Sequence, residues 1–569
     1  MPKIVSSNPG LTWAMAMALA VSACSEGGQV PEIGGSAEST TPRIEAISTK
    51  QNAARFLTQA SFGPTDESVQ QVQALGYLGW IDLQIVTQSP SHLTYVDNQL
   101  ARMKLTDPTA QLTAPHFHNS FWINAATSPA QLRERMKFAL SQIFVVSIND
   151  VRFDIRSAAS YYDMLGQHAF GNYRTLLGDV SRHPLMGVYL SHMGNQKEDP
   201  VTGRLPDENY AREILQLMSI GVVQLNIDGT PKLDSKGATI PSYTSSDVSN
   251  LAKVLTGYSW YSANPTDETF FGGNRDPQAQ VRPMINYNNF HSTSAKTFLG
   301  KTIPAGSSNA RAELDIALDV IFEHPNVGPF MAHRLIQRFV TSNPSPAYVG
   351  RVAAVFNDNG RGVRGDLAAV LKAVLLDPEA MRIGSTPGSG KLREPIIRLA
   401  NWMRAFNATS ASGYYLVGST RSFGSLGQAP LTAPSVFNFY RPGYVPPNSR
   451  LGGAKLSGPE FQTVDEVSIA GYANTIGGAI WDGIGAQAEV RANYAREIAI
   501  ADDAEALADR MNAILMYGQM PPALRRRIID AVNAIPIPSG PAEAAYARLN
   551  RVRMAVNLTM VSPDYLVQR

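Results

Sequence analysis

Apolar residues recur at helical spacing through most of the chain from Gln51 onward, and this period constrains the fold more than any other feature. Between residues 309 and 380 the helical segments follow one another almost without a break, as in NARAELDIALDVIFEHP, NVGPFMAHRLIQRFV and RGDLAAVLKAVLLDPEA. Residues three and four positions apart share one face of an α-helix, so this period predicts amphipathic helices around a common core. The sequence therefore predicts a mainly α fold, with residues 49–569 as a single large helical domain.

Cap and turn residues predict where several helices begin and end. Thr65 and Asp66 precede an apolar-periodic run that reaches Gly76, and Ser128 followed by Pro129 precedes another. Ser, Thr and Asp favour the N-cap, Pro the first helical position, and Gly the end of a helix. We expect one helix to run from Thr65 to Gly76 and a second to be capped by Ser128.

Strand signals are few. Residues 222–244 alternate apolar and polar side chains around Asp228 and Gly229, which predicts a small inserted β-hairpin. Residues 260–308 and 407–465 are rich in Gly, Pro, Asn and aromatic residues, and we expect long ordered loops there. Such loops are more often functional than idle, and they mark where the domain would be subdivided.

The N-terminus has the pattern of an export signal. Thirteen apolar or small residues, 11–23, follow Lys3 and end at the sequence VSAC, residues 21–24. A helix of this length spans about 20 Å, short of the roughly 30 Å hydrocarbon core of a bilayer. VSAC resembles a bacterial lipobox, so residues 1–23 are predicted to be a lipoprotein signal peptide and Cys24 the lipidated mature N-terminus. A plain signal peptide with an incidental cysteine is the alternative.

Residues 24–48 then form a flexible tether rich in Ser, Gly, Pro and Glu. The prediction is an exported protein held to the membrane by its N-terminal lipid, and Ser25 after the cysteine resembles the outer-membrane sorting pattern. Cys24 is the one cysteine, which leaves no thiol for catalysis, disulfides or metal binding elsewhere. The formal charge of +2, from 49 basic and 47 acidic residues, gives no field that would attract nucleic acid.

The stretch RLPDENYAREILQLMSIGV, Arg204–Val222, gathers the most polar groups. On a helix starting near Asp207, Glu208 and Arg212 form an i, i+4 pair, and Asn209 and Glu213 lie on one polar stripe. Acidic residues at a helix start complement its dipole, so this can be an ordinary helix start. A partly buried polar stripe is also found in active sites, and both interpretations stay open.

Other candidates lie elsewhere in the chain. His183 precedes Pro184, which favours a cap role, while His291 lies in a loop near Lys296. Arg334 and Arg338 are spaced to clamp an anionic group, although such arginines more often pair with internal acids. The chain has no His-Glu-x-x-His pattern, phosphate-binding loop or dinucleotide fingerprint, and neither a metal nor a cofactor is predicted.

Several stretches, in this order, resemble a large bacterial family known as domain of unknown function 1800 (DUF1800). They are AARFLTQASFGPT (53–65), RHPLMGVYLSHMGNQK (182–197), DENYAREILQLMSIGV (207–222), YTSSDVSNLAKVLTGYSW (243–260), HSTSAKTFLGKTI (291–303), HPNVGPFMAHRLIQRFVTSNPSPAYVGRVAAVF (324–356), LGQAPLTAPSVFNFYRPGYVPP (426–447) and SPDYLVQR (562–569). The resemblance implies a large, exported, mostly helical protein without an established activity. Members are often encoded beside exported proteins that resemble sulfatases or alkaline phosphatases, which implies an accessory role with such a partner.

The resemblance also bears on particular residues. Glu208, Asn209, Arg212 and Glu213 match the Asn-Glu-Asn-x-x-Arg-Glu core of the family. The sequence LSQIF, 140–144, stands where many members carry Trp-His-Asn-His-Phe, so both histidines are replaced. If those histidines bind metal or transfer protons elsewhere in the family, this chain lacks that site.

Two functions follow from these observations. The first is a lipid-anchored envelope protein that binds or assists a partner without catalysis. The second is an envelope-anchored hydrolase acting on a polymer or anionic substrate. Its catalytic candidates are Glu208, Asn209, Arg212, Glu213, His183 and His291, with Arg334, Arg338 and Lys296 as substrate-binding candidates. A purely structural lipoprotein is a third possibility.

Overall fold

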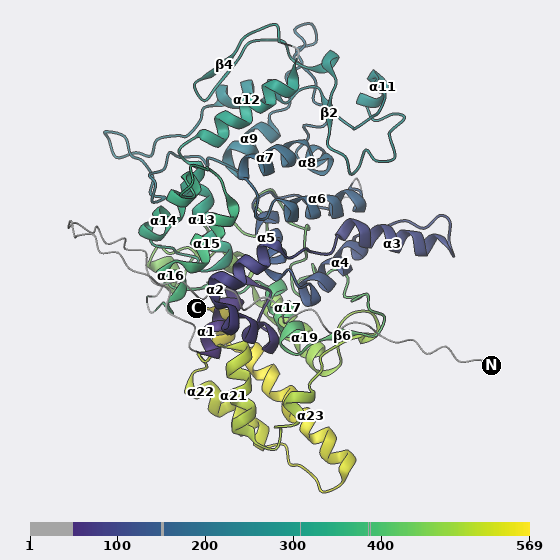
Figure 1. Ribbon diagram of the computed structural model, residues 1–569, viewed down its shortest axis with the longest axis vertical. Helices are drawn as coiled ribbons and strands as arrows, with labels where there is room; N and C mark the ends of the chain where they lie inside the picture. Colours follow the sequence, from purple (N-terminus) through teal and green to yellow (C-terminus); the bar gives the residue numbers. More distant parts are fainter. Residues whose placement is uncertain (1–48, 150–152, 308, 385, 387) are drawn as a thin grey trace, which may run out of the picture. The chain divides into compact units, whose positions relative to one another are not determined.

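The computed structural model describes residues 49–149, 153–307, 309–384, 386 and 388–569, and the described residues form one compact unit. The predicted signal peptide, Cys24 and the tether lie outside the described residues. The mainly α fold is confirmed (Figure 1). The longer helices of the first half are α1 Lys50–Ala60, α2 Asp66–Val86, α3 His92–Lys104, α4 Ala114–Thr127, α5 Gln131–Ser141, α6 Ile155–Gln167, α7 Tyr173–Arg182, α8 Pro184–Tyr189, α9 Asn209–Gln216 and α10 Ser245–Val254.

The longer helices of the second half share apolar faces with these. They are α12 Ala310–Glu323, α13 Val327–Phe339, α14 Pro346–Asn357, α15 Leu367–Leu376, α17 Pro395–Ala405, α19 Glu466–Trp481, α21 Ala504–Leu515, α22 Pro522–Asn533 and α23 Pro541–Met560. Short α-helices and 3-10 turns fill the connections: α11 Asp267–Phe270, α16 Pro378–Met381, α18 Arg450–Gly453, α20 Ala495–Ile498, α24 Pro563–Leu566, η1 Asn288–Phe290, η2 Pro459–Thr463 and η3 Ala486–Ala488. None of the helices in these ranges is both long and apolar enough to cross a membrane.

Within the part of the chain that the structure describes, the strands are two or three residues long and pair as two-stranded antiparallel ribbons. The ribbons are β1 Tyr258–Ser259 with β2 Ile285–Asn286, β3 Lys296–Phe298 with β4 Lys301–Ile303, β5 Lys391–Leu392 with β8 Val567–Gln568, and β6 Thr409–Ser410 with β7 Val490–Arg491. Strands this short do not form a sheet with its own core, so they fasten loops onto the helices.

Neighbouring helices pack in groups that bury one continuous apolar core. Helix α13 packs on α14 and α15, α12 on α7 and α10, and α23 on α19, α21 and α22. Figure 1 shows the last of these groups as the green and yellow helices, with α21, α22 and α23 side by side. The core runs through all groups and contains large side chains such as Trp80, Trp122 and Trp402. Burying aromatic side chains of this size contributes strongly to stability.

The two ends of the described chain meet. The Arg55 guanidinium in α1 donates to the carbonyl oxygens of Ala380, at 2.8 Å, and Arg382, at 2.7 Å, and Nε donates to that of Arg569, at 3.1 Å. The Gln568 amide of β8 donates to the carbonyl oxygen of Phe339 at 2.7 Å. These bonds join the first helix, the middle of the chain and the C-terminal residues, which accounts for one unit rather than several.

Capping residues explain most helix starts, and two expectations need correction. Thr65 caps α2 in a reciprocal capping box with Ser68, as its sequence suggests. Gly76, expected to end this helix, instead forms a kink at φ 73° inside α2, which continues to Val86. The kink has room because no neighbouring atom crowds Gly76.

The expected cap at Ser128 was wrong. The Ser128 N–H donates to the carbonyl oxygen of Asn124 at 3.0 Å, so Ser128 closes α4, and α5 begins only at Gln131. The Ser128 hydroxyl accepts from the N–H of Ala130 at 3.2 Å and holds the turn between the two helices.

The inserted arm is more irregular than a single hairpin. Its bridges join Val223 with Pro241, Leu225 with Pro231, and Leu233 with Thr239. The chain therefore turns twice, first around Asp228 and Gly229 as predicted, and again before Gly237 at φ 80°. Prolines at two of the bridged positions lack an N–H donor, which explains why no regular ladder forms.

Candidate functional site

The polar stretch from Asp207 to Glu213, called the family motif below, forms the start of α9. Asp207 precedes the helix, and its carboxylate accepts from the N–H of Asn209 at 2.8 Å. The Asn195 side chain holds Asp207 from both sides, donating to its carbonyl oxygen at 3.0 Å and accepting from its N–H at 2.8 Å. The Asn209 amide donates to the Ser191 hydroxyl at 3.3 Å. Asp207 therefore satisfies a free donor at the helix start, which is a structural task.

Glu208 and Arg212 lie at the surface. Arg212 Nη2 is 3.0 Å from Glu208 Oε2, and the side chains are 43% and 40% exposed. The i, i+4 pair expected from the sequence is present. Pairs with this exposure contribute only about 0–1 kcal/mol, because water and salt screen them.

Glu213 differs because it turns inward. It is 8% exposed, and its Oε2 atom is buried without a hydrogen-bond partner among the described residues. Burial raises the pKa of the Glu213 carboxyl above its usual range, and the nearby Arg212 charge opposes this only in part. Of the residues in the motif, Glu213 therefore has the electrostatic character of a functional acid.

His183 is buried as the N-cap of α8. Its Nδ1 accepts from the N–H of Leu185 at 3.2 Å, and its Nε2 lies 3.3 Å from the Ser160 hydroxyl. Its ring packs edge-on against Tyr161, with centroids 5.0 Å apart. Burial lowers the pKa of His183 to about 3, so the ring is neutral at physiological pH.

His291 and Lys296 come together around a third residue, Glu313 of α12. His291 Nε2 is 3.1 Å and Lys296 Nζ 2.7 Å from the same oxygen, Glu313 Oε2, and all three residues are at most 1% exposed. The other ring nitrogen of His291 donates to the carbonyl oxygen of Thr256 at 2.8 Å. This cluster fastens the loop that contains β3 onto α10 and α12. The sequence pointed to His291 and Lys296 but not to Glu313, because an acidic residue in the first turn of a helix is common.

Arg334 and Arg338 do not converge on one point. Arg334 stacks on Phe330 at 4.8 Å, and burial lowers its pKa to about 10, with Arg338 adding to this effect. Arg338 donates to the Gln142 side chain at 3.2 Å and to the Tyr440 hydroxyl. Among the ion pairs of the described residues, neither arginine takes part.

Arg338 belongs instead to a larger buried cluster around Glu394. Lys391 Nζ lies 3.0 Å from Glu460 and 4.0 Å from Glu394, and the Gln428 amide donates to Glu394 at 2.7 Å. Burial would raise the pKa of Glu394, but Lys391, Arg338 and Arg135 outweigh it and lower the pKa.

The cluster around Glu394 also includes the position where the expected family histidines are missing. Gln142 donates to Glu394 at 2.5 Å, while its neighbours Ser141 and Ile143 are buried. Ser141 and Ile143, the positions at which the family resemblance implied histidines, thus flank Gln142 of the cluster around Glu394 and lie apart from α9.

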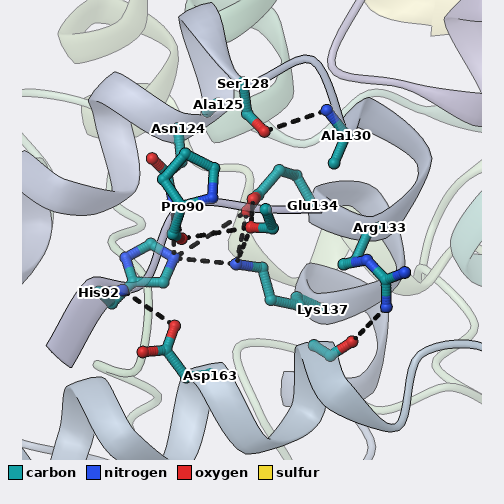
Figure 2. Close-up of polar contacts among 12 residues, drawn as sticks. Pro90, His92, Asn124, Ala125, Ser128, Ala130, Arg133, Glu134, Lys137 and Asp163 are labelled. Atoms are coloured by element: carbon teal, nitrogen blue, oxygen red, sulfur yellow. Dashed lines mark hydrogen bonds and ion pairs between the residues drawn. The ribbon is translucent and has the colours of Figure 1, made fainter. Parts of the chain in front are cut away.

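A further buried network, not found from the sequence, lies between α3, α4 and α5. Figure 2 shows His92, Glu134 and Lys137 directed at one another. Lys137 Nζ is 2.8 Å from Glu134, 3.1 Å from His92 Nε2 and 3.1 Å from the Ser89 hydroxyl, which itself donates to Glu134. Burial and Lys137 lower the pKa of His92 well below its usual value, so His92 is a neutral acceptor here.

All three N–H donors of Lys137 are therefore used. A serine hydroxyl beside a lysine can be a nucleophile, but only if the lysine is free to accept a proton. Because Lys137 is ion-paired and fully hydrogen-bonded, the network is a structural lock.

The larger cavities of the described part of the chain lie away from the polar candidates. A cavity of about 640 Å³ lies beside α2 and α17, and none of its described lining residues belongs to the set predicted from the sequence. Across the described residues, no group of three or more His, Cys, Asp or Glu side chains is arranged to hold a metal ion.

The geometry defines a mainly helical protein with several separate buried ionic clusters and one motif at a helix start. The family model described as "protein of unknown function (DUF1800)" matches residues 55–567, and the chain belongs to this family. No curated protein and no solved structure gives a significant match.

Proposed function

We propose that this protein is an exported, lipid-anchored envelope protein that binds a partner or ligand in an accessory role, without catalysing hydrolysis. One observation carries this proposal: the polar candidates are dispersed. Glu208 and Arg212 pair at the surface, whereas His183 and His291 are buried in separate sets of contacts. General acid–base catalysis requires such groups within hydrogen-bonding reach of one reacting atom.

The anchor rests on the sequence, and the partner rests on what the family resemblance implies. The lipobox at Cys24 and the tether supply the membrane attachment, and the partner proposed is an exported protein of the sulfatase or phosphatase-like class.

Fractionation of cells tests the anchor. The Cys24→Ala protein should leave the membrane fraction and appear in the soluble envelope fraction, while Ser25→Ala, at the neighbouring position, should stay with the membrane. Membrane retention of Cys24→Ala would refute the lipid anchor.

Hydrolysis is the second candidate, and one observation favours it. Glu213 is a buried carboxyl with a raised pKa, the property that a general acid needs. Glu213→Gln keeps the shape of the side chain and removes its proton chemistry. A hydrolase should then lose its action on the substrate while remaining folded, whereas an accessory protein should keep binding its partner.

A further inference from the structure

A second cavity, away from the family motif, has the features of a ligand site. It measures about 480 Å³ and lies between the end of α19, the turn that follows it, and α23. Its lining includes Trp481, Asp482, Arg491, Asn493, Tyr494 and Arg553. A concave pocket with an aromatic wall and a few convergent polar groups is the usual form of a small-molecule site.

Two guanidinium groups line this cavity without a carboxylate partner. Arg553 stacks on Trp481 at 5.5 Å, and its Nε is buried with no hydrogen-bond partner among the described residues. Nη1 also donates to the Asn550 side chain over a long 3.4 Å, and the Arg553 charge acts on the hydroxyl of Tyr494, another lining residue. Arg491 donates from Nε to the carbonyl oxygen of Ala488 at 3.0 Å, and the described ion pairs include neither arginine. Among the described residues, Nη2 of Arg553 and both terminal nitrogens of Arg491 have no hydrogen bond to the protein, so these groups can donate to a ligand.

The cavity wall is held in a strained conformation. Gln487 and Ala488 have φ values of 54° and 52°, in the left-handed region that side-chain-bearing residues seldom adopt. The turn is closed on both sides by hydrogen bonds between Ile484 and Val490, at 2.9 and 3.0 Å. A Cβ at Gly483 would lie 2.7 Å from the Ala488 carbonyl oxygen, so the turn closes tightly against its first residue. Strain kept in this way is characteristic of functional sites.

We propose that this cavity binds a hexuronic acid unit, the carboxylated sugar of an acidic glycan. The planar guanidinium groups of Arg553 and Arg491 match a carboxylate. The indole of Trp481 offers an apolar wall to the C–H face of a sugar ring, and Asp482 and Asn493 offer partners to its hydroxyl groups.

The net charge of the cavity lining favours a uronate over a phosphate dianion or a neutral sugar. Two arginines and the one carboxylate of the described lining, Asp482, leave a single net positive charge, which matches a monoanion. A phosphate dianion would lie near Asp482 at an electrostatic cost, and a neutral sugar would leave both arginines unpaired. The inference rests on the proposed binding function and names its ligand class.

Calorimetric titration of the full-length chain in detergent tests the site, with trigalacturonate as the probe and maltotriose and inorganic phosphate for comparison. Trigalacturonate should bind saturably. Arg553→Gln and Arg491→Gln should each weaken binding about tenfold or more, as expected for loss of a charged hydrogen-bond donor. Arg553→Lys keeps the charge, so its affinity for trigalacturonate should lie between that of the unmodified chain and that of Arg553→Gln. Arg526→Gln, an exposed arginine on α22, should bind as the unmodified chain does, and melting curves confirm that each variant is folded.

The outcomes separate the two proposals. Binding of maltotriose or phosphate as tight as that of trigalacturonate, or no effect of either arginine variant, would overturn the uronate site. Absence of trigalacturonate binding would overturn the site and leave the accessory role standing. Shortening of bound trigalacturonate would uphold the site and overturn the non-catalytic role.

Discussion

At the scale of single residues, Glu213 is a carboxyl group whose charged form is disfavoured by burial. Its pKa is raised in the folded protein, so the native state binds the proton more tightly than the unfolded chain does. Stability contributed by this group is therefore present at low pH and is lost as pH rises through the raised pKa.

Glu213→Gln should remove the loss of stability that accompanies ionisation of Glu213 as the pH rises. At pH 7 we expect the variant to be as stable as the unmodified protein or more stable, by up to about 1 kcal/mol, because a neutral amide replaces a poorly solvated carboxylate. The difference should vanish near pH 4. Urea unfolding at both pH values measures it, with Glu208→Gln as the exposed control. A clear destabilisation by Glu213→Gln at pH 7 would mean that the carboxylate makes a favourable native contact.

His183 should contribute to acid sensitivity in the opposite direction. Its pKa is 6.5 in the unfolded chain and about 3 in the fold, so below pH 6.5 only the unfolded state takes up the proton. Stability from this group is complete above pH 6.5 and falls as pH decreases toward 3, by about 2 kcal/mol at about pH 5.

His183→Asn tests this, since an Asn oxygen can still accept from the N–H of Leu185 at the N-cap. The variant should lose less stability than the unmodified protein between pH 7 and about pH 5 in thermal melts. His116→Asn, at an exposed helix start, is the matched control. An unchanged pH dependence for His183→Asn would contradict the buried neutral state.

At the scale of elements, the Lys137–Glu134 pair locks α5 against the segment before α3 and the residues at its start. Removing one partner leaves a buried charge alone, which costs about 3–5 kcal/mol. Glu134→Gln and Lys137→Met should each cause a loss of this order, and the double variant should lose clearly less than the sum. A double-mutant cycle by urea unfolding measures the coupling. The exposed pair Arg525 and Asp509, 2.7 Å apart, is the control and should show weak coupling. Additive losses at Glu134 and Lys137 would show that the network is not a lock.

Local chemistry explains which elements could be predicted. Thr244 caps α10 in a capping box with Asp247, three residues away, so the signal is complete in the sequence. Ser128 carries the same kind of signal, yet its N–H closes the preceding helix α4. A cap residue placed between two helices can serve either one, and tertiary packing decides.

The buried ionic clusters could not be predicted from the sequence, because tertiary packing brings their residues together from distant parts of the chain. Glu394 pairs with Lys391, which is near in the chain, but also meets Gln142 and Gln428 from distant segments. Spacing along a helix reveals pairs such as Glu208 and Arg212, which turn out to lie at the surface. It carries no information on contacts between helices far apart in sequence.

At the scale of the whole molecule, the polar candidates predicted from the sequence lie in separate places, and the proposed binding role rests on this dispersion. The buried ion pairs at Glu134, Glu313 and Glu394 lie in three different places: within α5, between α12 and β3, and between β5 and the start of α17. In the stretch that starts α9, Asp207 stabilises the helix start and Glu208 pairs with Arg212, while Glu213 is the one buried acid of that stretch.

The most direct test is complementation in a strain of the source organism that lacks this protein and shows an envelope defect as a result. Variants Glu208→Gln, Glu213→Gln and Cys24→Ala are expressed at equal levels, and their folding is verified by melting. We predict that the two glutamine variants restore the envelope phenotype and that Cys24→Ala does not. A folded Glu213→Gln protein that fails to complement would contradict the non-catalytic role, and a complementing Cys24→Ala protein would contradict the need for the lipid anchor.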